Sequence, residues 1–122
     1  MTLKMDAMAL QTFLRNDFGP MGEDFAVDRA DEAGITLRLL VDPRHLRFGG
    51  TVSGPAIFAL ADVAMYLAVL SQIGPRALAV TTNCAIDFMR KPKGGTDLLG
   101  QARVLKLGRT LAVGDVLVFS EG

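Results

Sequence analysis

The order of apolar and polar positions divides the chain into helical and strand-like segments. Residues 7–18 place apolar side chains near helical spacing, which predicts a short amphipathic helix that ends at Gly19-Pro20. Apolar side chains recur at every second position of residues 34–41, as is typical of a half-buried strand. The longest apolar segment, Val63 to Leu70, belongs to a predicted helix that is apolar on nearly every side and ends at Gly74-Pro75.

Strand-like runs dominate the second half of the chain. They comprise residues 77–89, 96–107 and 110–119, and the turn Gly108-Arg109 between the last two predicts an antiparallel hairpin. A short edge strand is also expected within residues 22–33. This order predicts an α+β fold in which one long helix packs on an antiparallel sheet.

A helix that is apolar on all sides must be covered on all sides. One sheet achieves this only by curling around the helix or with help from a second subunit. The composition agrees, since half of the residues are hydrophobic and 13 basic residues balance 13 acidic ones. This balance argues against a nucleic-acid-binding protein and favours burial against a partner copy. We expect a single domain over residues 1–122, with residues 1–20 as an N-terminal helical segment.

The sequence also argues against a disulfide-rich, zinc-binding, secreted or membrane protein. One cysteine, Cys84, and one histidine, His45, make a disulfide framework or a structural zinc site improbable, and we expect no cofactor. The N-terminus has acidic residues and no apolar core of secretory length. Residues 55–70 are shorter than the roughly 20 residues that a bilayer requires, and Asp62 lies at their centre. We therefore expect a cytoplasmic protein without a membrane partner.

Asp62 is the only charged residue between Ala56 and Leu70. Ser53 or Gly54 can cap this helix and Pro55 suits its first turn, so the free N–H of Gly54 would lie at the positive end of the helix dipole. Such a donor could stabilise a developing oxyanion. Eight residues of helix separate Gly54 from Asp62 by about 12 Å. One chain cannot bring both to one carbonyl, whereas two antiparallel copies of the helix could.

Each candidate also has a structural interpretation. Tyr66 lies one helical turn after Asp62 and either lines an acyl pocket or belongs to the core. His45 lies in a loop and is favoured as a loop-ordering residue, and Ser53 as a cap. The basic residues Arg90, Lys91 and Lys93 either form a solvated strand end or contact a phosphorylated carrier.

Two stretches, HLRFGGTVSGPAIFALADVA and TTNCAIDFMRKPKGG, resemble the hotdog-fold thioesterases. The similarity is greatest to acyl-CoA thioesterases of the phenylacetic-acid pathway. That family commonly reads H-x-N-x-x-G-x-V-H-G-G, followed after six residues by the acidic residue of L-A-D-x-A. The spacing is kept, and the residues that fall in register are His45, Gly50, Val52, Gly54, Leu60, Ala61, Asp62 and Ala64.

The resemblance implies a hotdog fold, a long central helix wrapped by a curved antiparallel sheet, that forms homodimers and often homotetramers. It also implies hydrolysis of an acyl-CoA thioester at the dimer interface. Gly54 would polarise the carbonyl, and Asp62 of the facing subunit would act as nucleophile or general base. The substrate-binding candidates are Arg47, Ser53, Tyr66, Asn83, Arg90 and Lys91.

The chain departs from the family pattern at the mouth of the expected site. Arg47 replaces an Asn or Gln, Ser53 replaces the His before the glycine, and Pro55 replaces the second glycine. Arg47 would add a cation that holds an acyl carboxylate or a CoA phosphate. The last strand of the family is also missing after residue 120, and we expect the sequence to be truncated there.

Three hypotheses follow from these residues. The first is a homo-oligomeric acyl-CoA thioesterase. The second is a non-catalytic protein of the same fold that binds an acyl-CoA or another small ligand, as the substitutions at Arg47, Ser53 and Pro55 would allow. The third is an enoyl-CoA hydratase or dehydratase, which would need a histidine in the site, and His45 is poorly placed for that role.

Overall fold

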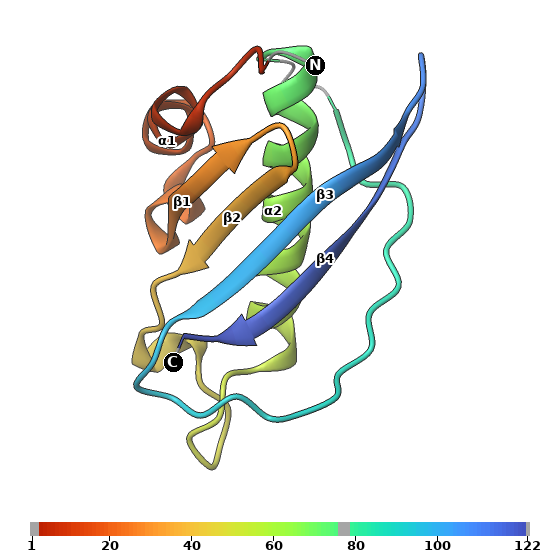
Figure 1. Ribbon diagram of the computed structural model, residues 1–122. Helices are drawn as coiled ribbons and strands as arrows, with labels where there is room; N and C mark the ends of the chain where they lie inside the picture. Colours follow the sequence, from red (N-terminus) through yellow and green to blue (C-terminus); the bar gives the residue numbers. More distant parts are fainter. Residues whose placement is uncertain (1–2, 76–78, 122) are drawn as a thin grey trace.

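A computed structural model, which describes residues 3–75 and 79–121, has an α+β architecture (Figure 1). A long helix, α2 (Gly54–Ile73), lies against one face of a four-stranded antiparallel sheet. The strands follow one another across the sheet in chain order, as β1 (Phe25–Asp31), β2 (Gly34–Leu39), β3 (Leu98–Leu107) and β4 (Ala112–Ser120). The predicted fold class is therefore confirmed.

The N-terminal segment covers the β1 side of the sheet, as Figure 1 shows. Its helix, α1 (Ala7–Asn16), begins where the Asp6 side chain accepts a hydrogen bond of 2.9 Å from the Ala9 N–H, which is an N-cap. Leu10 and Leu14 on its inner face are fully buried. A 3₁₀ turn, η1 (Pro20–Asp24), then leads into β1.

The long helix has the ends that the sequence predicts. It begins at Gly54 directly after the cap residue Ser53, and it stops at Ile73 because Gly74 adopts a φ of 92°, a left-handed conformation that favours glycine. The chain passes through a second 3₁₀ turn, η2 (Pro43–His45), before it reaches this helix.

Burial of leucine side chains holds α2 to the sheet. Leu60, Leu67 and Leu70 are completely buried, and each such side chain stabilises the fold by about 1.5–3 kcal/mol. The contact is closest at Gly100 of β3, where an added Cβ would lie only 3.2 Å from Leu60 Cγ. The absence of a side chain at this position lets the helix approach the sheet.

The helix α2 extends beyond residues 55–70, the apolar stretch whose length was compared with a membrane span. It has 20 residues, so by length and composition it could cross a membrane, and the argument from shortness was wrong. Half of its most apolar 18-residue window is buried inside the protein, as for the core helix of a globular fold. Asp62 also interrupts the apolar surface. The packing, rather than the length, therefore argues for a core helix.

The hairpin of β3 and β4 is confirmed, although its connection is longer than predicted. Residues 108–111 join the strands, and the Gly108 N–H donates to the Leu111 carbonyl at 2.8 Å. The pairing extends from Leu98↔Ser120 to Leu107↔Ala112, with an irregularity between Val104 and Lys106. The expected edge strand within residues 22–33 is β1, and the strand predicted over 34–41 ends at Leu39.

The strand predicted over residues 77–89 is not formed. Residues 77 and 78 lie outside the described residues, and residues 79–89 form no ladder with any described strand. Figure 1 shows this segment as a long connection that runs apart from β4. Its composition suits an extended backbone, but a strand also needs a neighbour that accepts its N–H groups, and the described residues supply none.

Candidate functional site

The N-terminus of α2 presents a backbone donor. The Ser53 hydroxyl accepts a hydrogen bond of 3.2 Å from the Ala56 N–H, which confirms Ser53 as the helix cap. Pro55 has no N–H, and none of residues 3–75 and 79–121 accepts a hydrogen bond from the Gly54 N–H. Because the helix dipole adds a partial positive charge here, this N–H is suited to bind the oxygen of a polarised carbonyl.

Asp62 lies two turns further along the same unbroken helix. Its residue is half-buried, and its carboxylate Oδ1 accepts a hydrogen bond of 2.5 Å from the Thr81 hydroxyl. Because α2 has no kink or break between Gly54 and Asp62, the two remain about 12 Å apart within one chain. The carboxylate is therefore available as a base or nucleophile. It is too far from Gly54 of the same chain for both groups to act on one carbonyl.

The extended segment 79–89 passes both ends of this stretch of helix. Thr81 reaches Asp62, and a Cβ added to Gly54 would lie 3.7 Å from Cζ of Phe88, an ordinary contact distance. Sequence reasoning identified neither Thr81 nor Phe88. The only signal was the pair Thr81-Thr82 in a strand-like run, and threonine is too common in strands for that pair to be specific.

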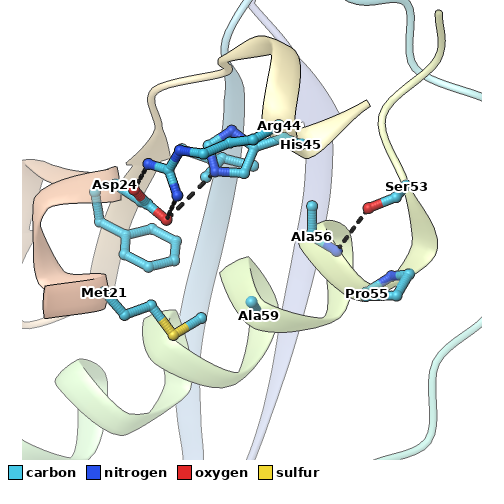
Figure 2. A pocket seen from close by; sticks show the side chains of 10 residues that line it. Met21, Asp24, Arg44, His45, Ser53, Pro55, Ala56 and Ala59 are labelled. Carbon is cyan, nitrogen blue, oxygen red and sulfur yellow. Dashed lines mark hydrogen bonds and ion pairs between the residues drawn. The ribbon is translucent and has the colours of Figure 1, made fainter. Parts of the chain in front are cut away.

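A second cluster of polar side chains surrounds His45, as Figure 2 shows. His45 is buried, its Nδ1 accepts a hydrogen bond of 3.0 Å from the Asp42 N–H, and its Nε2 lies 3.3 Å from Asp24 Oδ2. Nδ1 is therefore the acceptor nitrogen and Nε2 carries the hydrogen. This geometry supports the loop-ordering interpretation of His45.

Arg44 completes this cluster by an ion pair with Asp24. The hydrogen bonds from Arg44 hold the pKa of the Asp24 carboxyl below its usual range, and His45 contributes in the same direction. The cluster borders a pocket of 230 Å³, which Ser53, Pro55 and the first turns of α2 also line. In Figure 2 all three polar side chains point toward one another. The side chains of Asp24, Arg44 and His45 therefore form hydrogen bonds with one another.

Tyr66 packs toward the N-terminal helix. Its ring centroid lies 6.1 Å from that of Phe13 and 5.9 Å from that of Phe18, and burial raises the pKa of its hydroxyl. No hydrogen bond joins it to Asp62 in the described part of the chain. Its observed contacts are thus those of a core aromatic, although it lies one turn from Asp62.

The other predicted binding residues lie at the surface. Arg47, Asn83, Arg90 and Lys91 are all exposed, and the first of them lies in the loop that precedes α2. Within residues 3–75 and 79–121, none of the four forms a hydrogen bond or an ion pair with the Asp62 carboxylate. Among the described residues, no group of three or more His, Cys, Asp or Glu side chains could hold a metal ion.

Comparisons with known proteins place these features in context. Residues 49–122 match the family model described as the thioesterase superfamily. A Pseudomonas aeruginosa protein named "Putative esterase PA0474" is 32% identical over 78 residues, which are 64% of this chain. The chain spans 58% of the length of that curated relative.

Solved structures share the whole fold. A "putative thioesterase" from Silicibacter sp. TM1040 is 58% identical with a TM-score of 0.91, and the match covers 100% of this chain and 85% of that one. A mutant of the phenylacetic acid degradation protein PaaI from Thermus thermophilus is 31% identical with a TM-score of 0.72. That match covers 84% of this chain and 86% of the other.

A hypothetical thioesterase from Streptococcus pneumoniae, whose structure contains coenzyme A, has the same fold. It is 23% identical with a TM-score of 0.72, and the match covers 81% of this chain and 75% of the other. At this identity the likeness shows the fold alone. The hotdog architecture expected from the sequence is confirmed by these matches.

Proposed function

Because this chain belongs to the thioesterase superfamily, we propose that it hydrolyses the thioester bond of an acyl-CoA at a site shared by two copies of the chain. The observation that carries this proposal is the uninterrupted helix between Gly54 and Asp62. Its free N–H and its carboxylate are the two groups that acyl transfer to water requires, and they lie too far apart to act on one carbonyl. An antiparallel second copy brings the Asp62 of one subunit to the Gly54 of the other.

The proposed reaction uses these groups in sequence. The Asp62 carboxylate removes a proton from a water molecule, whose oxygen attacks the thioester carbon. Negative charge develops on the carbonyl oxygen, which accepts a hydrogen bond from the Gly54 N–H of the other subunit. The C–S bond then breaks, and the thiolate of CoA takes the proton from Asp62. The products are a carboxylic acid and free CoA.

A nucleophilic role of Asp62 remains the alternative chemical route. The Asp62 oxygen would then attack the thioester itself and form a mixed anhydride, which water opens. A single turnover in ¹⁸O-labelled water distinguishes the two routes. General-base catalysis places the label in the acid product at once, whereas the anhydride route transfers label into Asp62 when water attacks the carboxyl carbon of the protein.

A complementation experiment tests the shared site. Asp62→Asn removes the base, and Gly54→Leu blocks approach to the N–H, so each homodimer should be inactive. In a heterodimer of the two variants, the Gly54 of the first subunit faces the Asp62 of the second, and one of its two sites is intact. A random mixture contains half heterodimers and should recover about a quarter of wild-type activity.

The measurement is thiol release from a panel of short, medium, aromatic and dicarboxylic acyl-CoAs. Differently tagged variants are co-expressed, and the heterodimer is purified through both tags, after which about half of wild-type activity is expected. Circular dichroism and sedimentation confirm that each variant is folded and dimeric. Inactive heterodimers made from folded subunits would contradict a site that two chains share. A wild-type protein that turns over no acyl-CoA of the panel would contradict the thioesterase proposal itself.

The substitutions at Ser53 and Pro55 support a second candidate, a non-catalytic protein that binds acyl-CoA. Tight binding without turnover by the wild-type protein would select it. The hydratase hypothesis is disfavoured, because both ring nitrogens of His45 are engaged, with the Asp42 N–H and with Asp24. A histidine held in this way has no nitrogen free to add or remove water.

A further inference from the structure

A small β-hairpin projects from the end of the molecule at which α2 begins, and Figure 1 shows it below that helix. Leu46 and Val52 form its antiparallel bridge. The Arg47 N–H donates to the Thr51 carbonyl at 2.8 Å, and the Gly50 N–H donates to the Arg47 carbonyl at 3.0 Å. Residues 46–52 are called the tip hairpin below.

A second segment, residues 92–94, fixes the tip hairpin in place. The Val52 N–H donates to the Pro92 carbonyl at 2.8 Å, and the Gly94 N–H donates to the Gly50 carbonyl at 2.9 Å. Thr51 and Lys93 form an antiparallel bridge between the two segments. Residues 50–52 are therefore paired on both sides, with residues 46–47 of the hairpin and with residues 92–94.

This supported turn exposes an aromatic ring. Phe48 is fully exposed, with a relative accessibility of 102%, which is the highest of the large hydrophobic side chains that the described residues expose. A single exposed apolar side chain is not unusual by itself. Here, however, the ring is presented by a hydrogen-bonded turn rather than by a loose end of chain.

Unpaired positive charge surrounds the ring. Residues 46–53 and 90–95 together contain Arg47, Arg90, Lys91 and Lys93 and no acidic residue. All four cations are exposed, and within residues 3–75 and 79–121 none of them takes part in an ion pair. Four like charges on adjoining segments repel one another, and a bound anion would relieve that repulsion.

An exposed aromatic ring beside several cations matches the chemistry of a phosphorylated nucleotide. An adenine base stacks on an aromatic face, and arginine and lysine bind phosphate groups. We propose that the tip hairpin with residues 90–93 binds the adenosine 3′,5′-bisphosphate end of coenzyme A, with the adenine stacked on Phe48. This inference rests on the proposed function, and it identifies the acyl carrier as CoA rather than an acyl-carrier protein, which has no adenine.

The position of the tip hairpin relative to the reactive groups agrees with this assignment. Phe48 and Gly54 are six positions apart in the sequence, so their Cα atoms are at most about 20 Å apart. The nucleotide and the thioester of an acyl-CoA lie at opposite ends of a long pantetheine arm. A nucleotide at the tip hairpin thus leaves the arm to run toward the N-terminus of α2, where the Gly54 N–H is free.

The test compares two substrates that share one acyl group. Phe48→Ala and the double variant Lys91→Ala/Lys93→Ala are assayed with the acyl-CoA that the wild type hydrolyses fastest and with the matching acyl-pantetheine, which lacks the nucleotide. We expect KM for the acyl-CoA to rise about ten-fold in each variant, with kcat little changed. The kinetic constants for acyl-pantetheine should equal those of the wild type.

Matched controls remove the same groups elsewhere. Leu111→Ala shortens another exposed apolar side chain, and Lys106→Ala removes an exposed cation, both at the opposite end of the β3–β4 hairpin. Neither should change either KM. Sedimentation of Phe48→Ala should match the wild type, since a shift toward monomers would assign Phe48 to subunit contact and overturn the proposal.

Calorimetry with adenosine 3′,5′-bisphosphate separates this inference from the thioesterase proposal. Binding to the wild type that weakens in Phe48→Ala supports the inference, even if no acyl-CoA is turned over. An unchanged KM of Phe48→Ala for acyl-CoA in an active enzyme overturns it while the thioesterase function stands. Faster hydrolysis of the same acyl group on an acyl-carrier protein than on CoA would also overturn it, because these cations would then bind the acidic surface of that protein.

Discussion

At the scale of single residues, the Asp62 carboxylate depends on one hydrogen-bond donor. A charge inside an apolar helix is expensive without compensation, and the Thr81 hydroxyl supplies some of it. Thr81, which donates to that carboxylate, lies 19 residues away along the chain. Only the path of the extended segment brings the two together, and no periodicity in the sequence encodes that path.

Thr81 is predicted to position the Asp62 carboxylate for reaction. Its hydroxyl donates to one oxygen of the carboxylate, which leaves the second oxygen to face the substrate. Thr81→Val keeps the shape of the side chain and removes the donor. We expect kcat to fall about 10- to 100-fold with KM little changed.

Two further variants decide whether the hydroxyl itself is responsible. Thr81→Ser retains a donor and should keep most of the activity, and Thr82→Val changes the exposed neighbour and should have no effect. Steady-state kinetics of all three variants are the measurement. If Thr81→Val kept the wild-type kcat, the hydrogen bond would have no positioning role.

At the scale of elements, local chemistry was predictable and long-range pairing was not. The ends of α2 follow from Ser53 and Gly74, whose capping roles depend only on their neighbours. The strand predicted over residues 77–89 failed because a pattern of apolar residues indicates an extended backbone but not a pairing partner. The same limit hid the bridge between Thr51 and Lys93, which joins segments about 40 residues apart in the chain.

The contacts between the two 3₁₀ turns, η1 and η2, are predicted to make the free energy of unfolding depend on pH. Asp24 ends η1, and it binds Arg44 and His45 of η2. Because its pKa is lower in the folded protein than in the unfolded chain, ionised Asp24 stabilises the fold. This contribution is complete above the unfolded-state pKa of about 3.9 and disappears as the pH falls through the lower folded-state value.

Asp24→Asn tests this linkage. The variant keeps a similar shape and removes the charge, so we expect a loss of about 1–3 kcal/mol in the free energy of unfolding at pH 7. The difference from wild type should shrink as the pH falls below about 3.9, because Asp24 of the unfolded wild-type chain then takes up a proton. Urea titrations at several pH values measure it. A difference that stayed constant down to pH 3 would show that the charge of Asp24 is not the cause.

At the scale of the whole molecule, the face of α2 turned away from the sheet is incompletely covered. Phe58, one turn before Asp62, is 37% exposed. The neighbouring extended segment exposes Val80, Phe88 and Met89. Apolar side chains of two adjoining segments thus flank the Asp62 carboxylate at the surface. Such a surface is typical of an interface, and a second copy at this face is what the proposed shared site needs.

Phe58→Asp should therefore separate the subunits and abolish activity together. A carboxylate placed in an apolar interface loses its hydration without gaining a partner, and we expect the dimer dissociation constant to rise roughly 100-fold or more. Each monomer should still fold, because Phe58 contributes little to the core of its own chain. Sedimentation velocity across a concentration series, with thiol release measured on the same samples, follows both quantities.

The control is Met8→Asp, which adds the same charge to an exposed position of α1, 79% accessible and not part of this face. It should leave the association and the activity unchanged. In Phe58→Asp, activity should return in proportion to the dimer fraction as the protein concentration is raised, since Gly54 and Asp62 are both intact in every chain. An active monomer would contradict the proposal that two chains share the site.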